Sequence, residues 1–101
     1  MSLSLLAQTL IVTPAEITGD GASHPVNSTE QARWVLFVAP SGNTGVIRIG
    51  DSNVSSTRGT PIPAGAGLMY PVLPIGQAGY KLSSIYYFIT SGDKLDIVWS
   101  R

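Results

Sequence analysis

Side chains that could carry out covalent or acid–base chemistry are few in this sequence. The chain has no cysteine, and its one histidine, His24, stands in a polar loop before Pro25. Serines are plentiful, so a Ser-His-Asp site is formally possible. However, none of them stands in the G-x-S-x-G turn that exposes a nucleophile, and a triad is defined by geometry and not by composition. We therefore interpret His24 as an exposed loop residue and predict that the protein is not an enzyme.

Asp93 and Asp96 come closest to a carboxylate pair. Asp93 ends a predicted tight turn, Ser91-Gly92-Asp93. An aspartate at a turn commonly accepts hydrogen bonds from nearby backbone amides, so we predict this role for Asp93, and we expect Asp96 to face solvent. Metal centres need several converging ligands. One histidine and scattered acids do not supply a recognisable set, so the sequence predicts no metal and no cofactor.

Aromatic side chains could instead form a sugar-binding face. Aromatic residues also dominate buried cores and subunit interfaces, and several here alternate within apolar strand patterns. We favour packing and keep a carbohydrate-binding β-sandwich module as the alternative. A coplanar row of exposed aromatics beside Asn, Asp or Arg would distinguish that alternative. The aromatic residues considered are Trp34, Trp99, Tyr70, Tyr80, Tyr86 and Tyr87.

Composition limits the class of partner. The chain has 101 residues, which is the size of one domain, and six basic and six acidic side chains give it a formal net charge of zero. Proteins that bind nucleic acid normally carry a basic excess, so we expect no nucleic-acid partner. Charged residues make up 12% of the chain, which is low for a small soluble monomer. A partner that covers apolar surface is the expected remedy.

No segment of the sequence predicts membrane insertion or export. The apolar stretch 3–12 is far shorter than the roughly 20 residues that a spanning helix needs, and it contains polar side chains. A signal peptide would carry positive charge ahead of its apolar region, whereas the first basic residue here is Arg33. The expectation is a chain made and kept in the cytoplasm, or packaged there, with no membrane partner.

Apolar runs separated by Gly- and Pro-rich turns predict an all-β fold. Segment 4–13 is open between helix and strand, with its Thr, Ile and Val residues favouring a strand or an extended arm. We expect 33–38 and 46–49 to form a hairpin, and 19–30 and 54–60 to be loops or loosely extended. Further strands are predicted at 15–18, 68–73, 82–90 and 94–100, with Pro71 confining 68–73 to an edge. The fold class is a single-domain antiparallel β-sandwich or jelly-roll-like barrel.

Alternation predicts which strand faces are buried. In 94–100, Leu95, Ile97 and Trp99 share an apolar face opposite Lys94 and Asp96. Strands 33–38 and 82–90 are apolar on both faces, so both faces must be covered. Because a domain of this size builds one sandwich core, we expect the second face to meet another subunit. The candidate oligomer interface is Trp34, Leu36, Tyr86, Tyr87 and Phe88.

Two segments of the sequence resemble a family of virion proteins. They are RWVLFVAPSGNTGVIRIGDSNVSSTRGTPIPAGAG and YKLSSIYYFITSGDKLDIVWS, which together cover roughly residues 32 to 100. Their most distinctive parts are 48–52, 54–59, 82–86 and 92–94. The chain resembles the capsid decoration, or cement, proteins of tailed bacteriophages. This resemblance implies a β-sandwich or jelly-roll-like domain that oligomerises, often as a trimer, on the outside of a phage head and clamps the major capsid protein.

The resemblance also bears on the amino-terminal segment. Residues 1–18 are predicted to be either a first strand or an arm ahead of a sandwich domain at 19–101. In proteins of this kind such an arm often makes the capsid contact. The candidate capsid or subunit contact is Leu3, Leu5, Leu6, Leu10 and Ile11. The expected location is the virion surface, with the chain itself and the major capsid protein as partners; a fibre or tail component is not distinguished from a head decoration.

Overall fold

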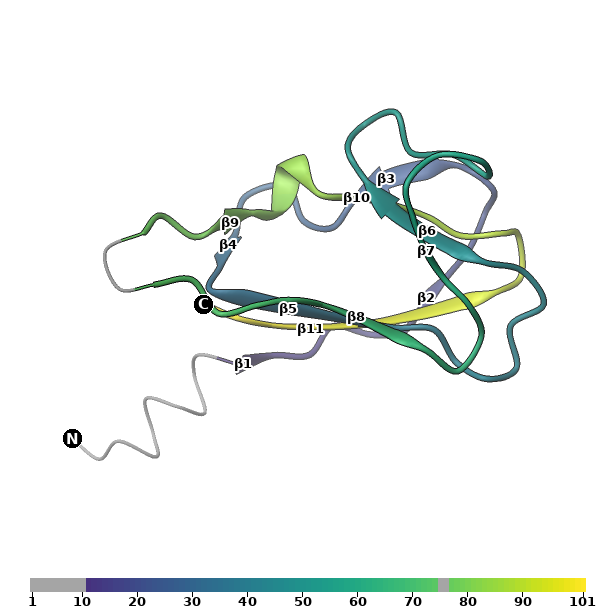
Figure 1. The fold of residues 1–101 in the computed structure, drawn as a ribbon, viewed down its shortest axis with the longest axis horizontal. Helices are drawn as coiled ribbons and strands as arrows, with labels where there is room; N and C mark the ends of the chain where they lie inside the picture. Colours follow the sequence, from purple (N-terminus) through teal and green to yellow (C-terminus); the bar gives the residue numbers. More distant parts are fainter. Residues whose placement is uncertain (1–10, 75–76) are drawn as a thin grey trace.

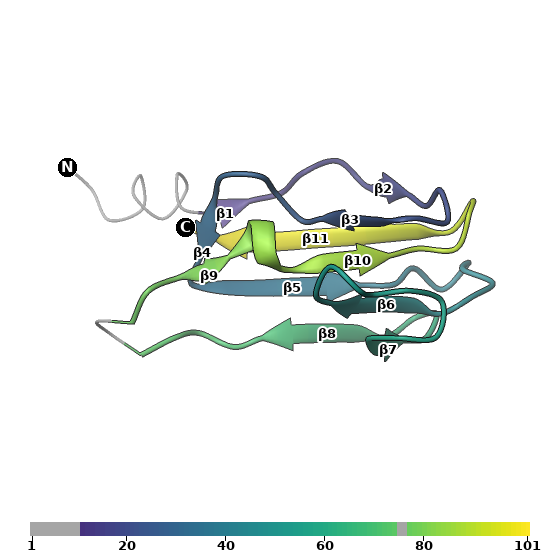
Figure 2. The same ribbon diagram turned by 90° about the horizontal axis from the view of Figure 1, so that it is seen from above.

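Two antiparallel sheets stacked face to face make up most of the fold (Figures 1 and 2). The computed structural model describes residues 11–74 and 77–101. The first sheet has the order β1 (Ile11–Val12), β11 (Lys94–Ser100), β5 (Trp34–Val38) and β8 (Gly67–Tyr70), and β2 (Ile17–Thr18) also pairs with β11. The second has the order β3 (Ser23–Pro25), β10 (Tyr86–Phe88), β6 (Ile47–Gly50) and β7 (Thr60–Ile62). The predicted β-sandwich is confirmed, and its jelly-roll form stays a prediction.

The core lies between the two sheets and is built by alternation along the strands. The first sheet contributes Val35 and Phe37 from β5, and Leu95, Ile97 and Trp99 from β11; all five side chains are buried. The second sheet contributes the buried side chains of Ile47, Ile49 and Ile62. These positions are two residues apart, which places them on one side of each strand. The predicted faces of 33–38 and 94–100 are therefore confirmed.

Proline positions agree with the sheet edges. β8 ends at Tyr70 and lies at the edge of the first sheet, as predicted from Pro71. Pro61 lies within β7, opposite Arg48 of β6. Because β7 is the edge strand of the second sheet, the missing amide proton of Pro61 leaves no ladder hydrogen bond unmade.

The predicted hairpin between 33–38 and 46–49 is wrong. β5 pairs with β11 and β8, whereas β6 pairs with β10 and β7, so the two strands lie in different sheets. The loop between them crosses from one layer to the other (Figure 1). Gly42 and Asn43 suit a hairpin turn and a crossing loop equally well, so local turn chemistry did not distinguish the two connections.

The predicted strand at 82–90 is also wrong in its first half. A short 3₁₀ helix, η1 (Leu82–Ser84), precedes β10, and Leu82 and Ile85 are both buried. Side chains three residues apart eclipse each other in a 3₁₀ turn, so both point into the core. Strand alternation through 82–90 predicts that Leu82 shares a face with Tyr86 and Phe88, whereas the structure buries it together with Ile85.

The described part of the amino-terminal segment belongs to the first sheet. Ile11 and Val12 pair with Ser100 and Trp99, and further along the chain Ile17 pairs with Leu95. Val12 and Ile17 pack against the core. Residues 11–18 therefore form an edge of the sandwich, whereas the predicted contact residues Leu3, Leu5, Leu6 and Leu10 lie outside the described residues.

Polar side chains clamp one end of the sandwich where the chain crosses between sheets. The Asn43 side-chain amide donates to the Lys94 carbonyl, and its oxygen accepts from the Lys94 amide, both at 2.8 Å. Asp93 accepts from the backbone amides of Thr44 at 3.0 Å and Gly45 at 2.8 Å. The β5–β6 loop is thus fixed to the turn that precedes β11.

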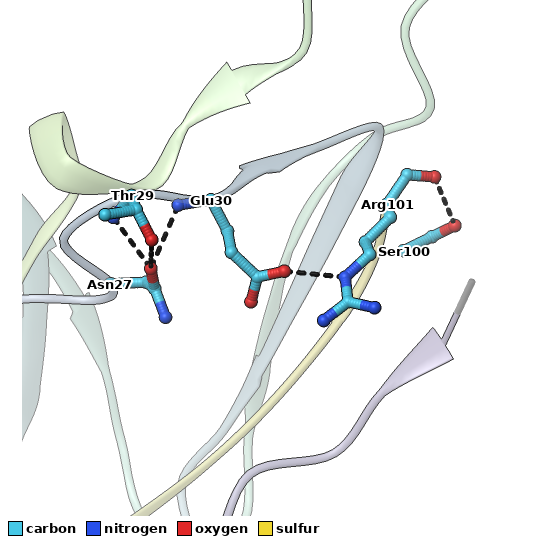
Figure 3. A network of polar contacts seen from close by, with 5 residues as sticks. All are labelled: Asn27, Thr29, Glu30, Ser100 and Arg101. Carbon is cyan, nitrogen blue, oxygen red and sulfur yellow. Dashed lines mark hydrogen bonds and ion pairs between the residues drawn. The ribbon is translucent and has the colours of Figure 1, made fainter. Parts of the chain in front are cut away.

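The opposite end is held by a second polar network, which joins the loop after β3 to the end of β11 (Figure 3). Asn27 Oδ1 accepts from the amides of Thr29 at 2.9 Å and Glu30 at 3.0 Å, which shapes the loop. The Glu30 carboxylate then accepts from Arg101 Nε at 2.6 Å. A small ribbon of β4 (Gln31–Ala32) and β9 (Tyr80–Lys81) covers this end (Figure 2).

Candidate interaction surfaces

An apolar surface covers the side of the first sheet that faces away from the core. The strand register places Leu36 between Val98 on β11 and Met69 on β8. Trp34 lies opposite Ser100, which in turn lies opposite Ile11 of β1. These positions alternate with the core positions, so their side chains point outward. We call this surface the β5 outer face; it consists of Ile11, Trp34, Leu36, Val38, Met69 and Val98.

The β5 outer face leaves large apolar side chains partly in water. Met69 is 49% exposed and Ile11 is 45% exposed, and the other four side chains are half-buried. Single exposed apolar residues are ordinary on protein surfaces, but a contiguous group across neighbouring strands is typical of an interaction site. The arrangement can bind another apolar surface and offers no group for acid–base chemistry.

Polar side chains border this face at the other end of β11. Lys94 Nζ donates to Thr18 Oγ1 at 2.8 Å. Glu16 shares a hydrogen bond with the side chain of Asp96, and this bond, more than any burial, raises the pKa of Glu16. Asp96 therefore lies on the outer side of the sheet, as predicted. The border limits the apolar area to the end of the sheet near β1.

The second sheet has an outer face of a different character. Tyr86 and Phe88 both point outward from β10, and both are half-buried. Phe88 lies opposite Arg48 of β6, whose guanidinium donates to the carbonyls of Ser56 and Gly59, both at 3.0 Å. We call this the β10 outer face. Two aromatic side chains beside a fixed arginine could stack on a planar or sugar-like ligand.

The predicted oligomer interface is divided by this arrangement. Trp34 and Leu36 lie on the β5 outer face, whereas Tyr86 and Phe88 lie on the opposite side of the sandwich. Tyr87 points inward, packs against the core and lies opposite Ile49. The five residues therefore do not form one surface, and the sequence prediction missed three members of the β5 outer face: Val38, Met69 and Val98.

Tyr87 and His24 form a partly buried pair on the inner side of the second sheet. Their ring centroids are 5.9 Å apart, and burial raises the pKa of the Tyr87 hydroxyl. His24 Nε2 lies 2.8 Å from Asp20 Oδ2, and this contact holds the pKa of Asp20 below its usual range. The histidine thus links a loop aspartate to an aromatic ring.

An open pocket of about 420 Å³ lies beside the loop after β6. It is lined in part by Asp51, Asn53, Val54 and Arg58. Asp51 Oδ1 accepts from the amide of Asn53 at 2.9 Å, so the carboxylate holds its own loop. Within residues 11–74 and 77–101, no three His, Cys, Asp or Glu side chains gather as a metal site would require.

Comparisons with known proteins add no assignment. No family model, no curated protein and no solved structure matches this chain. In the portion of the chain that the structure describes, no helix has the length and apolar character needed to cross a membrane.

Proposed function

We propose that this protein is a non-enzymatic structural protein that works by assembling with other protein surfaces. The observation that carries the proposal is the β5 outer face, where apolar side chains from adjacent strands lie side by side and remain partly in water. Covering such a face stabilises an assembly by roughly 25 cal/mol per Å² of apolar area removed from water. The hydrogen-bond networks at both ends of the sandwich hold its loops in place, which suits a protein whose surface must match that of a partner.

The specific role that we propose is that of a capsid decoration protein of a tailed bacteriophage. The resemblance of residues 32 to 100 to such proteins supports it, as does the low charge, which limits repulsion between densely packed copies. A protein that binds the assembled shell and not its free subunits adds its binding free energy to the stability of the shell. Repeated binding on a symmetric lattice increases the apparent affinity further.

The test is whether the protein is bound to phage particles and is purified together with them. A tagged copy would be expressed in the cells that naturally carry the gene, and the particles released after induction would be separated on a density gradient. We expect the tag in the particle band, at positions that follow the lattice symmetry when the particles are imaged. A tag found only in the soluble fraction, with particles present, would contradict the decoration role.

Carbohydrate binding is the second candidate, and the β10 outer face favours it. Tyr86 and Phe88 stand two residues apart on the outer side of β10, with Arg48 beside them. A glycan array would show binding that Tyr86→Ala and Phe88→Ala each abolish, while Leu36→Ala on the opposite sheet leaves it unchanged. Binding that survives both aromatic substitutions, or no binding at all, would exclude this face as a sugar site.

A further inference from the structure

We infer that the β5 outer face is covered by residues 1–10 of a second copy of this chain. This deepens the proposed function and rests on its claim that the chain assembles with copies of itself; binding to a particle is not required. The β5 outer face is apolar and partly exposed, and residues 1–10 of the same sequence are rich in leucine. Three features of the molecule point to this occupant.

The first feature is the direction of the chain at β1. β1 runs antiparallel to β11, with Ile11 opposite Ser100, the last residue of β11. β1 therefore begins beside the carboxyl end of β11, at one end of the first sheet. Residues 1–10 contain no Gly, Pro, Asn or Asp, the residues that most readily reverse a chain. Ten residues reach up to about 33 Å when extended, which is enough to meet an adjacent copy.

The second feature is chemical match. Residues 1–10 carry no charged side chain and include Leu3, Leu5, Leu6 and Leu10. The acceptor face carries apolar side chains where β1, β11, β5 and β8 adjoin, and its charged border lies at the far end, at Lys94 and Asp96. An uncharged leucine-rich segment can cover this face without desolvating a charge.

The third feature is area. A patch four strands wide and five residues long covers about 15 by 17 Å, or roughly 250 Å², from the usual strand spacings. A stable interface needs about 800 Å² from each partner, so two such faces packed against each other would be too small. An exchanged segment contributes its own surface in addition to the face. Exchange of a terminal segment between identical chains is also a common route to closed oligomers.

The absence of cysteine makes a direct test possible. Leu6→Cys is made in a tagged copy and Met69→Cys in an untagged copy. The two proteins are unfolded, mixed, refolded together and treated with a flexible bis-maleimide. We expect a covalent band of one tagged and one untagged chain on a denaturing gel. Val46→Cys replaces Met69→Cys in the control, because Val46 is also exposed, at 39%, but precedes β6 in the other sheet.

The outcomes separate the alternatives. A crosslink with Met69→Cys but not with Val46→Cys supports the exchange. As a further control, Leu6→Cys and Met69→Cys are combined in one chain. If a crosslink forms within that chain but not between separate chains, the segment covers its own sheet and the inference is wrong. The absence of any crosslink involving Met69→Cys also overturns it.

Mass measurement gives an independent readout in solution without particles. By light scattering, the unmodified chain is expected at a multiple of 10.6 kDa. Deletion of residues 2–10 and the substitution Leu36→Asp should each reduce the mass to that of one chain, whereas Val46→Asp should not. An oligomer that survives the deletion contradicts the inference but leaves self-assembly intact. A monomeric unmodified chain overturns the inference, and the particle test then decides the decoration role separately.

Discussion

Asp93 is the side chain through which two distant loops are held together. Asp93 is 6% exposed, and its carboxylate accepts hydrogen bonds from the amides of Thr44 and Gly45 and from the Thr44 hydroxyl at 3.1 Å. These donors favour the charged carboxylate and lower the pKa of Asp93. The prediction that Asp93 accepts hydrogen bonds from backbone amides is confirmed, but the expectation that these amides are close to it in sequence is wrong. The sequence did not indicate which amides, because the donors come from a loop nearly half the chain away.

The lowered pKa of Asp93 predicts a pH-dependent contribution to stability. A carboxyl whose pKa is depressed on folding stabilises the native state above its unfolded pKa, about 3.9 for aspartate, and loses that effect as pH falls through the folded pKa. Asp93→Asn should lower the melting temperature at pH 7. The difference between the two proteins should be steady down to about pH 5 and should shrink below about pH 4. A difference that stays constant to pH 2 would show that the charge of Asp93 is irrelevant.

Gly19 is required for close approach at the same end of the sandwich. Its amide donates to the Asp93 carbonyl at 2.8 Å, and a Cβ at this position would come within 2.4 Å of the Thr90 carbonyl oxygen. Gly19→Ala should therefore destabilise the fold by about 1–3 kcal/mol, as overpacking does.

Gly42 is the matched control for Gly19, since a Cβ there meets no atom within 4 Å and the residue has no positive φ. Gly42→Ala should be neutral or slightly stabilising, by up to about 1 kcal/mol. Chemical denaturation of both variants measures the contrast. Equal midpoints for the two would contradict the packing at Gly19.

At the scale of elements, alternation was the reliable signal. It identified the buried sides of β5 and β11 because side chains on a strand alternate strictly between core and solvent. Strand partners were not predictable in the same way. The assumed pairing of β5 with β6 failed because pairing depends on contacts between segments far apart in sequence. The strand predicted at 82–90 was wrong in its first half for a related reason. The 3₁₀ turn at Leu82–Ser84 changes which side chains face the core, and the residue types in this segment do not reveal that turn.

The missed members of the β5 outer face illustrate the same limit. Val98 shares its side of β11 with Lys94 and Asp96, so its strand suggested a polar outer face. Met69 lies in a proline-bounded edge strand whose phase the sequence left open. Only the register, which places Val98, Leu36 and Met69 side by side, makes one surface of them.

Trp99 provides the test of the strand faces. It is 2% exposed on the inner side of β11, so Trp99→Ala should cost about 3–5 kcal/mol of unfolding free energy. Lys94→Ala, on the outer side of the same strand, should cost less than about 1 kcal/mol. Urea denaturation measures both.

Trp99→Phe refines this test. The Trp99 Nε1 is buried without a hydrogen-bond partner among the described residues, and an unmade hydrogen bond is costly in an apolar core. Phenylalanine removes that donor while keeping an aromatic ring, so it should be tolerated much better than alanine. Equal losses of unfolding free energy for Trp99→Ala, Trp99→Phe and Lys94→Ala would mean that the faces of β11 are assigned wrongly.

At the scale of the whole molecule, the two outer faces imply different behaviour. The β5 outer face is apolar, with mostly aliphatic side chains, and suits a permanent cover, whereas the β10 outer face has two aromatic side chains and an arginine whose guanidinium donates to loop carbonyls. The core and the two end clamps depend on contacts within one chain. We therefore expect folding and assembly to be separable, with assembly adding stability to a domain that is already folded.

That separation predicts how the melting temperature depends on protein concentration. A partner that binds the folded chain and not the unfolded chain stabilises it by mass action, so the melting temperature of a self-associating protein rises with concentration. The unmodified chain should show this rise in differential scanning fluorimetry across the micromolar range. Leu36→Asp should melt cooperatively at a lower temperature that does not change with concentration, because it disrupts the β5 outer face and leaves the core intact. Val46→Asp should retain the concentration dependence. If the unmodified chain melted at one temperature throughout this range, the β5 outer face would not be covered by another copy in solution.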